Sequence, residues 1–190
     1  MTAIVGFTKD NTVYLAGDTL GSNSNLKSEY TESKVFKNGS FIFGYTDTFR
    51  FGEILEYNFV PPEHTKGVSD KAFLVKDFIP KLRNVLEECK YVKAEDKAGN
   101  GTFLMGYRGK LYKVQSDWSI LEPTCGYTAV GSGDEICIGA ISALKDIEEF
   151  TPKEKVIKAI EIASKHNPYV GGKITVKSLK YKKGETWMKK

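Results

Sequence analysis

The sequence begins with Met1 followed directly by Thr2, and two apolar segments then lead to a single Asp18. A small second residue lets a methionine aminopeptidase remove Met1, which would leave Thr2 with a free α-amine. A threonine at the N-terminus carries a hydroxyl nucleophile and a neighbouring base on one residue, which is one way to activate a hydroxyl for attack on an amide. Threonine is also common at position 2 without this chemistry, so the interpretation needs other residues to support it.

The composition is that of an ordinary globular protein. The chain has 190 residues, of which 41% are apolar and 27% are charged, and its formal net charge is +4. This length predicts one domain over residues 1–190 with a substantial core. The chain lacks a basic face interleaved with aromatic residues and glycines, so we expect no nucleic-acid partner.

The cysteines and histidines argue against a metal site. Cys89, Cys125 and Cys137 are odd in number and lack metal-ligand spacing, and His64 and His166 stand alone. We therefore expect no metal ion and no cofactor. Free cysteines fit a reducing compartment, and the sequence has neither a secretory leader pattern nor an apolar run near the ~18 residues of a membrane span. These features predict a cytoplasmic protein with no membrane partner.

Short segments rich in β-branched and aromatic residues recur along the chain and predict strands. Two-residue turn signals predict three hairpins, which turn at Asp10-Asn11, Asn38-Gly39 and Arg108-Gly109. The predicted strands lie in residues 3–9, 12–18, 34–46, 102–120 and 126–133, with a closing strand pair over 173–188. No strand is predicted in the polar stretch 19–33.

Apolar residues at helical spacing predict the helices. The predicted helices cover residues 47–59, 69–90, 134–150 and 151–166, and a loop is expected over 92–101. The first helix begins at an N-cap of Asp47 or Thr48 and is weakened by Gly52. Pro80 is expected to kink the second, and a capping box at Thr151 begins the last. Strands and helices in such segregated groups predict an α+β protein, a four-layer αββα sandwich of two stacked antiparallel sheets between helix pairs.

Several motifs in this order resemble one family. Asp18 ends an AGD motif 16 residues after Thr2, and Lys34 begins a KV pair 32 residues after Thr2. The segments FIFGY, GTFLMGYRGKLYKV and AVGSGDEICIGA follow in the remaining chain. These motifs and intervals resemble those of the proteasome β-subunits and, more closely, HslV, the proteasome-like peptidase of bacteria. The resemblance covers nearly the whole chain and implies the fold of N-terminal-nucleophile (Ntn) hydrolases.

The resemblance implies a role for four residues. Thr2 would be the nucleophile, with its α-amine as the general base once Met1 is removed. Lys34 would lower the pKa of the Thr2 hydroxyl, and Asp18 would hold the charge of Lys34 in place. Ser132 would bind the α-amine and orient it. The same resemblance implies that the segment after FIFGY supplies backbone N–H donors for the oxyanion.

The first substrate subsite is expected to follow the same strand. Its predicted lining residues are Thr46, Asp47, Phe49 and Arg50. The family usually has small residues in this segment, so an Asp47 carboxylate near the pocket would disfavour acidic substrate side chains and weaken oxyanion stabilisation. A second departure lies near the last helix, where Asn167 and Val170 replace an aspartate and a serine of the proteasome pattern, although HslV departs from this pattern too.

Each motif also has a purely structural explanation. Asp18 could end a strand, Lys34 could be a surface residue beside one, and Ser132 could cap a helix. The intervals favour function: a threonine peptidase that cleaves peptides or unfolded proteins. The resemblance further implies a homo-oligomeric ring or double ring and an ATPase unfoldase partner. Two alternatives remain, a non-peptidase amidohydrolase of the same fold and an inactive ring-forming subunit. The second is disfavoured because such subunits carry an N-terminal extension where only Met1 precedes Thr2.

Overall fold

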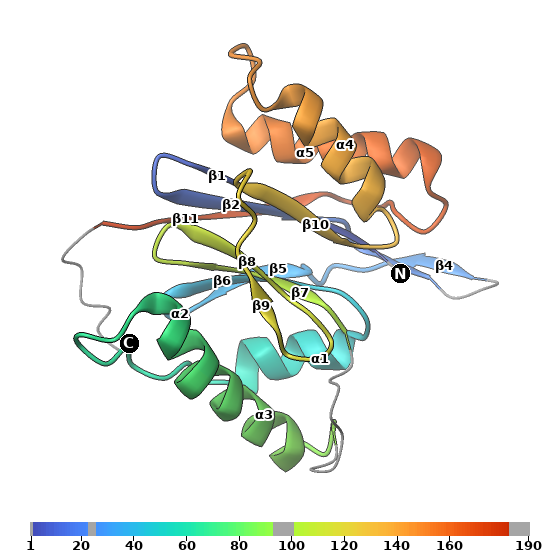
Figure 1. Cartoon of the computed structure of the whole chain (residues 1–190). Helices are drawn as coiled ribbons and strands as arrows, with labels where there is room; N and C mark the ends of the chain where they lie inside the picture. The colour runs from blue at the N-terminus through green and yellow to red at the C-terminus, as the bar shows by residue number, and fades with distance from the viewer. Residues whose placement is uncertain (1, 23–25, 93–100, 183–190) are drawn as a thin grey trace.

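Two antiparallel β-sheets lie face to face at the centre of the computed structural model (Figure 1), which describes residues 2–22, 26–92 and 101–182. The first sheet has the order β10-β1-β2-β11. Its strands are β1 (Ala3–Lys9), β2 (Thr12–Gly17), β10 (Tyr127–Gly131) and β11 (Thr175–Lys180). The second sheet has the order β5-β6-β7-β8-β9. Its strands are β5 (Val35–Asn38), β6 (Phe41–Tyr45), β7 (Phe103–Tyr107), β8 (Lys110–Val114) and β9 (Ile120–Leu121).

Helices cover the outer face of each sheet (Figure 1). The first sheet is covered by α4 (Asp134–Leu144) and α5 (Pro152–His166), and the second by α1 (Phe49–Glu53), α2 (Asp70–Phe73) and α3 (Ile79–Glu88). Buried apolar residues form three groups that match the three interfaces between these layers: one under α4 and α5, one between the sheets and one over α1 to α3. The predicted αββα sandwich is confirmed.

The predicted hairpins are present, and one of them turns a residue later than expected. Asp10 and Asn11 have φ values of 49° and 56°, as a type I′ turn requires. The second turn lies at Gly39-Ser40, because Asn38 still pairs with Phe41. The Asn38 side-chain amide donates to the carbonyls of Leu55 (2.8 Å) and Phe59 (2.6 Å), so this asparagine anchors the following helical segment.

The first helical segment begins at Phe49, and its N-cap is Thr48, whose Oγ1 accepts from the N–H of Phe51 at 3.2 Å. The alternative N-cap, Asp47, is wrong. A π-helical turn over Ile54–Asn58 continues α1. Gly52 is required by packing, since a Cβ there would come within 2.2 Å of the Tyr45 ring.

The second helical segment also contains a π-helical turn, Leu74–Phe78, between α2 and α3, and this turn ends two residues before Pro80. Most of the loop predicted over 92–101 lies outside the described residues. The last helix has the predicted capping box between Thr151 and Glu154.

Three predictions about elements need correction or completion. The stretch predicted to lack strands contains a hairpin of β3 (Leu20–Ser22) and β4 (Lys27–Glu29). The third helix ends at Leu144, whereas the prediction extended it to residue 150. Of the closing strand pair, β11 is present and residues 183–190 lie outside the described part. Within the described residues, no helix is long and apolar enough to span a membrane.

Candidate active site

The pairing of β1 with β2 brings Thr2 and Asp18 together. Thr2 directly precedes β1, Asp18 directly follows β2, and Ile4 pairs with Gly17. Lys34 directly precedes β5 in the other sheet, and its backbone carbonyl accepts from the N–H of Tyr45 at 3.1 Å. Three strand ends, from both sheets, thus meet at one site.

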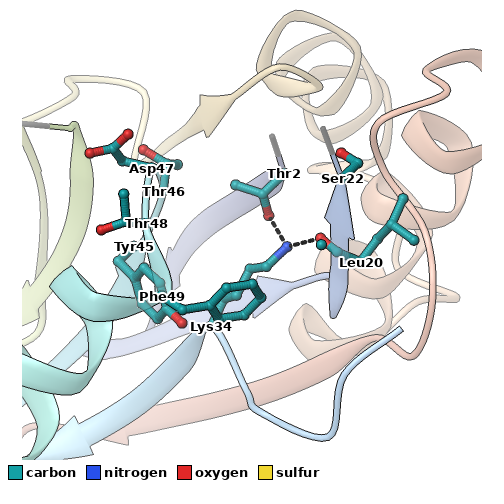
Figure 2. Close-up of a pocket in the computed structure, with 10 residues that line it drawn as sticks. Thr2, Leu20, Ser22, Lys34, Tyr45, Thr46, Asp47, Thr48 and Phe49 are labelled. Atoms are coloured by element: carbon teal, nitrogen blue, oxygen red, sulfur yellow. Dashed lines mark hydrogen bonds between the residues drawn. The ribbon is translucent and has the colours of Figure 1, made fainter. Parts of the chain in front are cut away.

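Lys34 links these residues through its ammonium group. Its Nζ lies 2.9 Å from Thr2 Oγ1, 3.2 Å from Asp18 Oδ1 and 2.6 Å from the carbonyl oxygen of Leu20. Figure 2 shows the bonds to Thr2 and Leu20. The Thr2 hydroxyl in turn donates to Asp18 Oδ1. An ammonium has three protons, and all three have an acceptor here.

The carboxylate of Asp18 is completely buried, and backbone groups stabilise it. Oδ1 accepts from the N–H of Ala3 at 3.0 Å, and Oδ2 accepts from the N–H of Gly171 at 3.2 Å. Charge-assisted bonds of this kind offset the cost of removing a carboxylate from water. Sequence reasoning missed Ala3, Gly171 and the Leu20 carbonyl, since a backbone group leaves no signal in residue type.

Burial lowers the pKa of the Lys34 ammonium below its ordinary value, while the charge of Asp18 and its hydrogen bond act in the opposite direction. Only 5% of Lys34 is exposed. A lysine with a lowered pKa exchanges a proton more readily near neutral pH than a surface lysine does. The Lys34 ammonium, which donates to the Thr2 hydroxyl, is therefore suited to proton transfer as well as to charge stabilisation.

Ser132 lies beside Thr2 and bonds the backbone of that residue. Its hydroxyl donates to the backbone carbonyl of Thr2 at 3.2 Å, and the N–H of Gly133 reaches the same oxygen at 3.3 Å. At Gly131, with a φ of 100°, a Cβ would come within 2.3 Å of this oxygen. The close approach of this segment to Thr2 thus depends on a glycine.

The two residues that depart from the proteasome pattern both lie close to this segment. The side-chain amide of Asn167 donates to the carbonyl of Ser132 at 2.5 Å, and its Oδ1 accepts from the N–H of Tyr169 at 2.9 Å. Val170 is buried in the core beneath α4 and α5. Asn167 therefore supports the position of Ser132, and Val170 contributes packing.

A cavity of about 240 Å³ opens beside the Thr2 hydroxyl (Figure 2). Its lining residues are Thr2, Leu20, Gly21, Ser22, Lys34, Tyr45, Thr46, Asp47, Thr48 and Phe49. Three of the four predicted subsite residues are among them. The fourth, Arg50, is not: its side chain is 55% exposed and forms an ion pair with Glu53 at 3.4 Å.

Asp47 lines the cavity, and its carboxylate is bonded to another side chain. In Figure 2 its carboxylate points away from Thr2, and Oδ2 accepts from the hydroxyl of Tyr91 at 3.1 Å. Sequence reasoning missed Tyr91, which lies 44 residues further along the chain.

The site as a whole presents a hydroxyl between an ammonium and a carboxylate, next to a cavity. Such an arrangement can stabilise an alkoxide during attack on a carbonyl carbon.

Comparison with known proteins identifies relatives of this fold. BPH of Thiobacillus denitrificans has a TM-score of 0.79 and 19% identity, with 95% of this chain and 99% of that chain covered. The same protein in complex with epoxomicin has a TM-score of 0.79 and 17% identity, with the same coverage of both chains. HslV from Trypanosoma brucei gives a TM-score of 0.69 and 16% identity, covering 94% of this chain and 99% of that chain. At these identities the likeness shows a common fold. A family model described as "Proteasome subunit" matches residues 2–179. The chain therefore belongs to the proteasome subunit family.

Proposed function

We propose that this chain is a threonine peptidase with Thr2 as its nucleophile, acting after cleavage of the Met1–Thr2 bond. The observation that carries the proposal is the position of the Thr2 hydroxyl, 2.9 Å from the Lys34 ammonium and beside a cavity. Asp18 completes the arrangement as the buried partner of both residues. Membership of the proteasome subunit family supports a peptide substrate over a small amide.

The reaction begins with attack of Thr2 Oγ1 on the carbonyl carbon of a peptide bond. The hydroxyl proton passes to the free α-amine, directly or through a water, while the carbonyl electron pair moves onto its oxygen. Lys34 stabilises the developing alkoxide by its charge. When the tetrahedral intermediate collapses, the C–N bond breaks, the proton moves to the departing amine, and an ester on Thr2 remains. Water then hydrolyses the ester and restores the hydroxyl.

The oxyanion needs donors on the opposite side of the reacting carbon. The segment of Thr46, Asp47 and Thr48 lines the cavity across from Lys34 (Figure 2). We assign the oxyanion to backbone N–H groups of this segment, which requires no particular side chain. Ser132, placed at the Thr2 carbonyl, fixes the residue that carries both nucleophile and base.

Peptide hydrolysis by four forms of the chain tests this proposal. Thr2→Ala should abolish turnover and leave folding intact, because the residue contributes far less to the core than the buried leucines whose truncation costs roughly 2–5 kcal/mol. Lys34→Ala should lower the rate by roughly 10³-fold or more, since these residues act as a unit. An uncleavable N-terminal tag should abolish turnover by the wild type. The tag keeps the Thr2 nitrogen in a peptide bond, and an amide nitrogen is not basic.

Thr8→Ala is the matched control, since its hydroxyl also donates a hydrogen bond, here to the carbonyl of Gly126 at 2.9 Å. This variant should keep wild-type turnover. Wild-type hydrolysis by Thr2→Ala would overturn the mechanism, and so would an active sample whose intact mass shows Met1 fully retained. Turnover of small acylated amides without peptide cleavage would indicate an amidohydrolase, and no turnover of either would indicate an inactive subunit.

The proposal extends to assembly. As a proteasome-family peptidase in the cytoplasm, the chain would form a homo-oligomeric ring or double ring, with an ATPase unfoldase that supplies unfolded chains. Native mass spectrometry should show a closed oligomer, and a monomer at micromolar concentration would contradict it. Epoxomicin, which a structural relative binds, should bind the wild type and not Thr2→Ala.

A further inference from the structure

One wall of the cavity contains a backbone conformation that needs support. Asp47 has a φ of 77°, in a region that residues other than glycine rarely adopt. Its neighbours Thr46 and Thr48 line the same cavity. Such conformations persist where the surrounding structure holds them, and they gather at functional sites.

A chain of hydrogen bonds supplies this support. The Tyr91 hydroxyl lies 3.1 Å from Asp47 Oδ2 and 2.8 Å from Thr48 Oγ1. A carboxylate can only accept, so Tyr91 donates to Asp47 and the Thr48 hydroxyl donates to Tyr91. Thr48 Oγ1 also accepts from the N–H of Phe51, the bond that begins α1. These bonds connect the four residues in one continuous network.

The backbone of Tyr91 is itself fixed by the end of α3. The N–H of Tyr91 bonds the carbonyl of Leu86, and the N–H of Lys90 bonds that of Glu87, both at 2.9 Å. Lys90 has a φ of 55°. This is the Schellman pattern of helix termini, with Lys90 in the position that glycine usually occupies. The Tyr91 ring also lies 5.8 Å from the ring of Phe51, centroid to centroid.

The other side of the same segment is closed by the chain at residues 101 and 102. The Thr46 hydroxyl donates to the carbonyl of Thr102 at 2.6 Å. A Cβ at Gly101 would come within 2.9 Å of the Cβ of Asp47. With these contacts fixing one side, the hydroxyl of Tyr91 provides the polar contact to the Asp47 side chain itself.

We infer that Tyr91 is a positioning residue for the proposed peptidase reaction: its hydroxyl holds Asp47 and Thr48 so that the backbone N–H groups of residues 46–48 are placed for the oxyanion. The inference rests on the proposed function. Tyr91 acts through the segment and not on the substrate. Oxyanion donors stabilise the transition state more than bound substrate, so their misplacement lowers kcat and leaves KM nearly unchanged.

Steady-state kinetics of substituted chains test the positioning role. Tyr91→Phe keeps the ring and removes the hydroxyl, and it should lower kcat by about 10-fold with KM within about twofold, a fraction of the roughly 10²–10³-fold effect of losing a whole donor. Asp47→Ala should lower kcat by a similar factor. Asp47→Asn, whose amide oxygen still accepts from Tyr91 and which tolerates positive φ, should restore kcat to within about twofold of the wild type.

Tyr107→Phe is the matched control. Its hydroxyl bonds His64 Nδ1 at 2.8 Å, and its ring belongs to the same apolar cluster as Tyr91. It lies at the opposite end of β7 from Phe103, which pairs with Tyr45 at the cavity. This variant should lose thermal stability like Tyr91→Phe and keep the wild-type kcat. If both tyrosine variants lost kcat equally, the effect would be structural and the positioning role would be overturned.

A thermal cycle on the same variants does not depend on activity. Tyr91→Phe and Asp47→Ala should each lower Tm by about 2–4 °C, and the double variant should lose clearly less than the sum because the two share one hydrogen bond. Additive losses of Tm would show that Tyr91 and Asp47 are not in contact, whether or not the chain cleaves peptides. Coupled losses of Tm with an unchanged kcat would refute positioning alone. A wild type without any turnover would refute the proposed function, and catalytic positioning with it, while the thermal cycle still decides the contact.

Discussion

Two carboxylate–cation pairs lie at opposite ends of the sandwich and differ in their exposure to water. Asp18 and Lys34 are 3.2 Å apart, with side chains 0% and 6% exposed. Asp70 and Arg108 are 2.8 Å apart, with side chains 23% and 38% exposed. The Asp70–Arg108 pair is thus shorter but more exposed to solvent. Distance alone does not indicate which pair stabilises the fold more.

The two pairs also shift pKa values in opposite directions. Burial lowers the pKa of Lys34, whereas the hydrogen bond that Arg108 donates to Asp70 raises the pKa of Arg108. Each oxygen of Asp18 is bonded by a backbone N–H, while Asp70 shares its surroundings with water and with His64 at 3.8 Å. A buried pair requires every donor and acceptor to be satisfied, whereas water replaces missing partners at the exposed pair.

The largest expected difference follows from neutralising each carboxylate. Asp18→Asn leaves Lys34 buried without an anion and turns an amide N–H₂ towards backbone donors, so it should cost about 3–5 kcal/mol of unfolding free energy. Asp70→Asn should cost less than about 1 kcal/mol, because that pair is screened by solvent. Urea denaturation of both variants beside the wild type measures the difference.

Hydrolysis assays extend the same comparison. Under the proposed function, Asp18→Asn should lose most of its turnover even at urea concentrations where the variant is still folded. Asp70→Asn should keep its turnover under the same conditions. Equal urea midpoints for the two variants would show that burial does not distinguish the pairs.

The pH dependence should separate the pairs in a second way. A folded-state pKa of Lys34 below its unfolded value near 10.5 means that the unfolded chain binds more protons between those two values. The contribution of Lys34 to stability should therefore rise with pH through this window and be complete above it. Unfolding free energies of the wild type and Lys34→Met, subtracted at each pH from neutral to alkaline, measure this contribution.

The proposed mechanism gives a kinetic counterpart. kcat should fall as the pH rises through the lowered pKa of Lys34, since the ammonium that stabilises the alkoxide is then lost. Asp70→Asn should show the same alkaline limb as the wild type. A constant difference in unfolding free energy between the wild type and Lys34→Met across this range would contradict the lowered pKa.

Local patterns in the sequence were sufficient to predict most of the fold. Hairpins appear where residue type determines backbone conformation, as at Asp10-Asn11, and the capping box at Thr151 marks the start of α5. The errors occur where tertiary contacts determine the ends of an element. Asn38 remains in its strand because its side chain binds carbonyls of the following helical segment.

The short β3–β4 hairpin is the clearest miss. Its segments, LGS and KSE, have too few β-branched or aromatic residues to predict strands. The Leu20 carbonyl in β3 nevertheless accepts from Lys34 at 2.6 Å.

For the site, the interval between Thr2 and Asp18 was informative because β1 and β2 form one hairpin of fixed register. The remaining contacts left no such signal. Those of Gly171 and Ala3 involve backbone groups, and Tyr91 reaches the site through a helix terminus where lysine stands in place of the usual glycine. Only the tertiary structure brings these groups together.

The smallest effect is expected at the exposed pair itself. Arg108 has a φ of 48° and precedes Gly109 at 79°, so it occupies a turn position that asparagine prefers. Arg108→Asn loses the ion pair with Asp70 and the contact with the Tyr181 ring at 5.5 Å, together about 1 kcal/mol at this exposure. It gains a similar amount, about 1 kcal/mol, from the relief of positive φ. The urea midpoint should therefore stay close to that of the wild type. A loss of more than about 2 kcal/mol would mean that Asp70 and Arg108 stabilise the fold as a buried pair does.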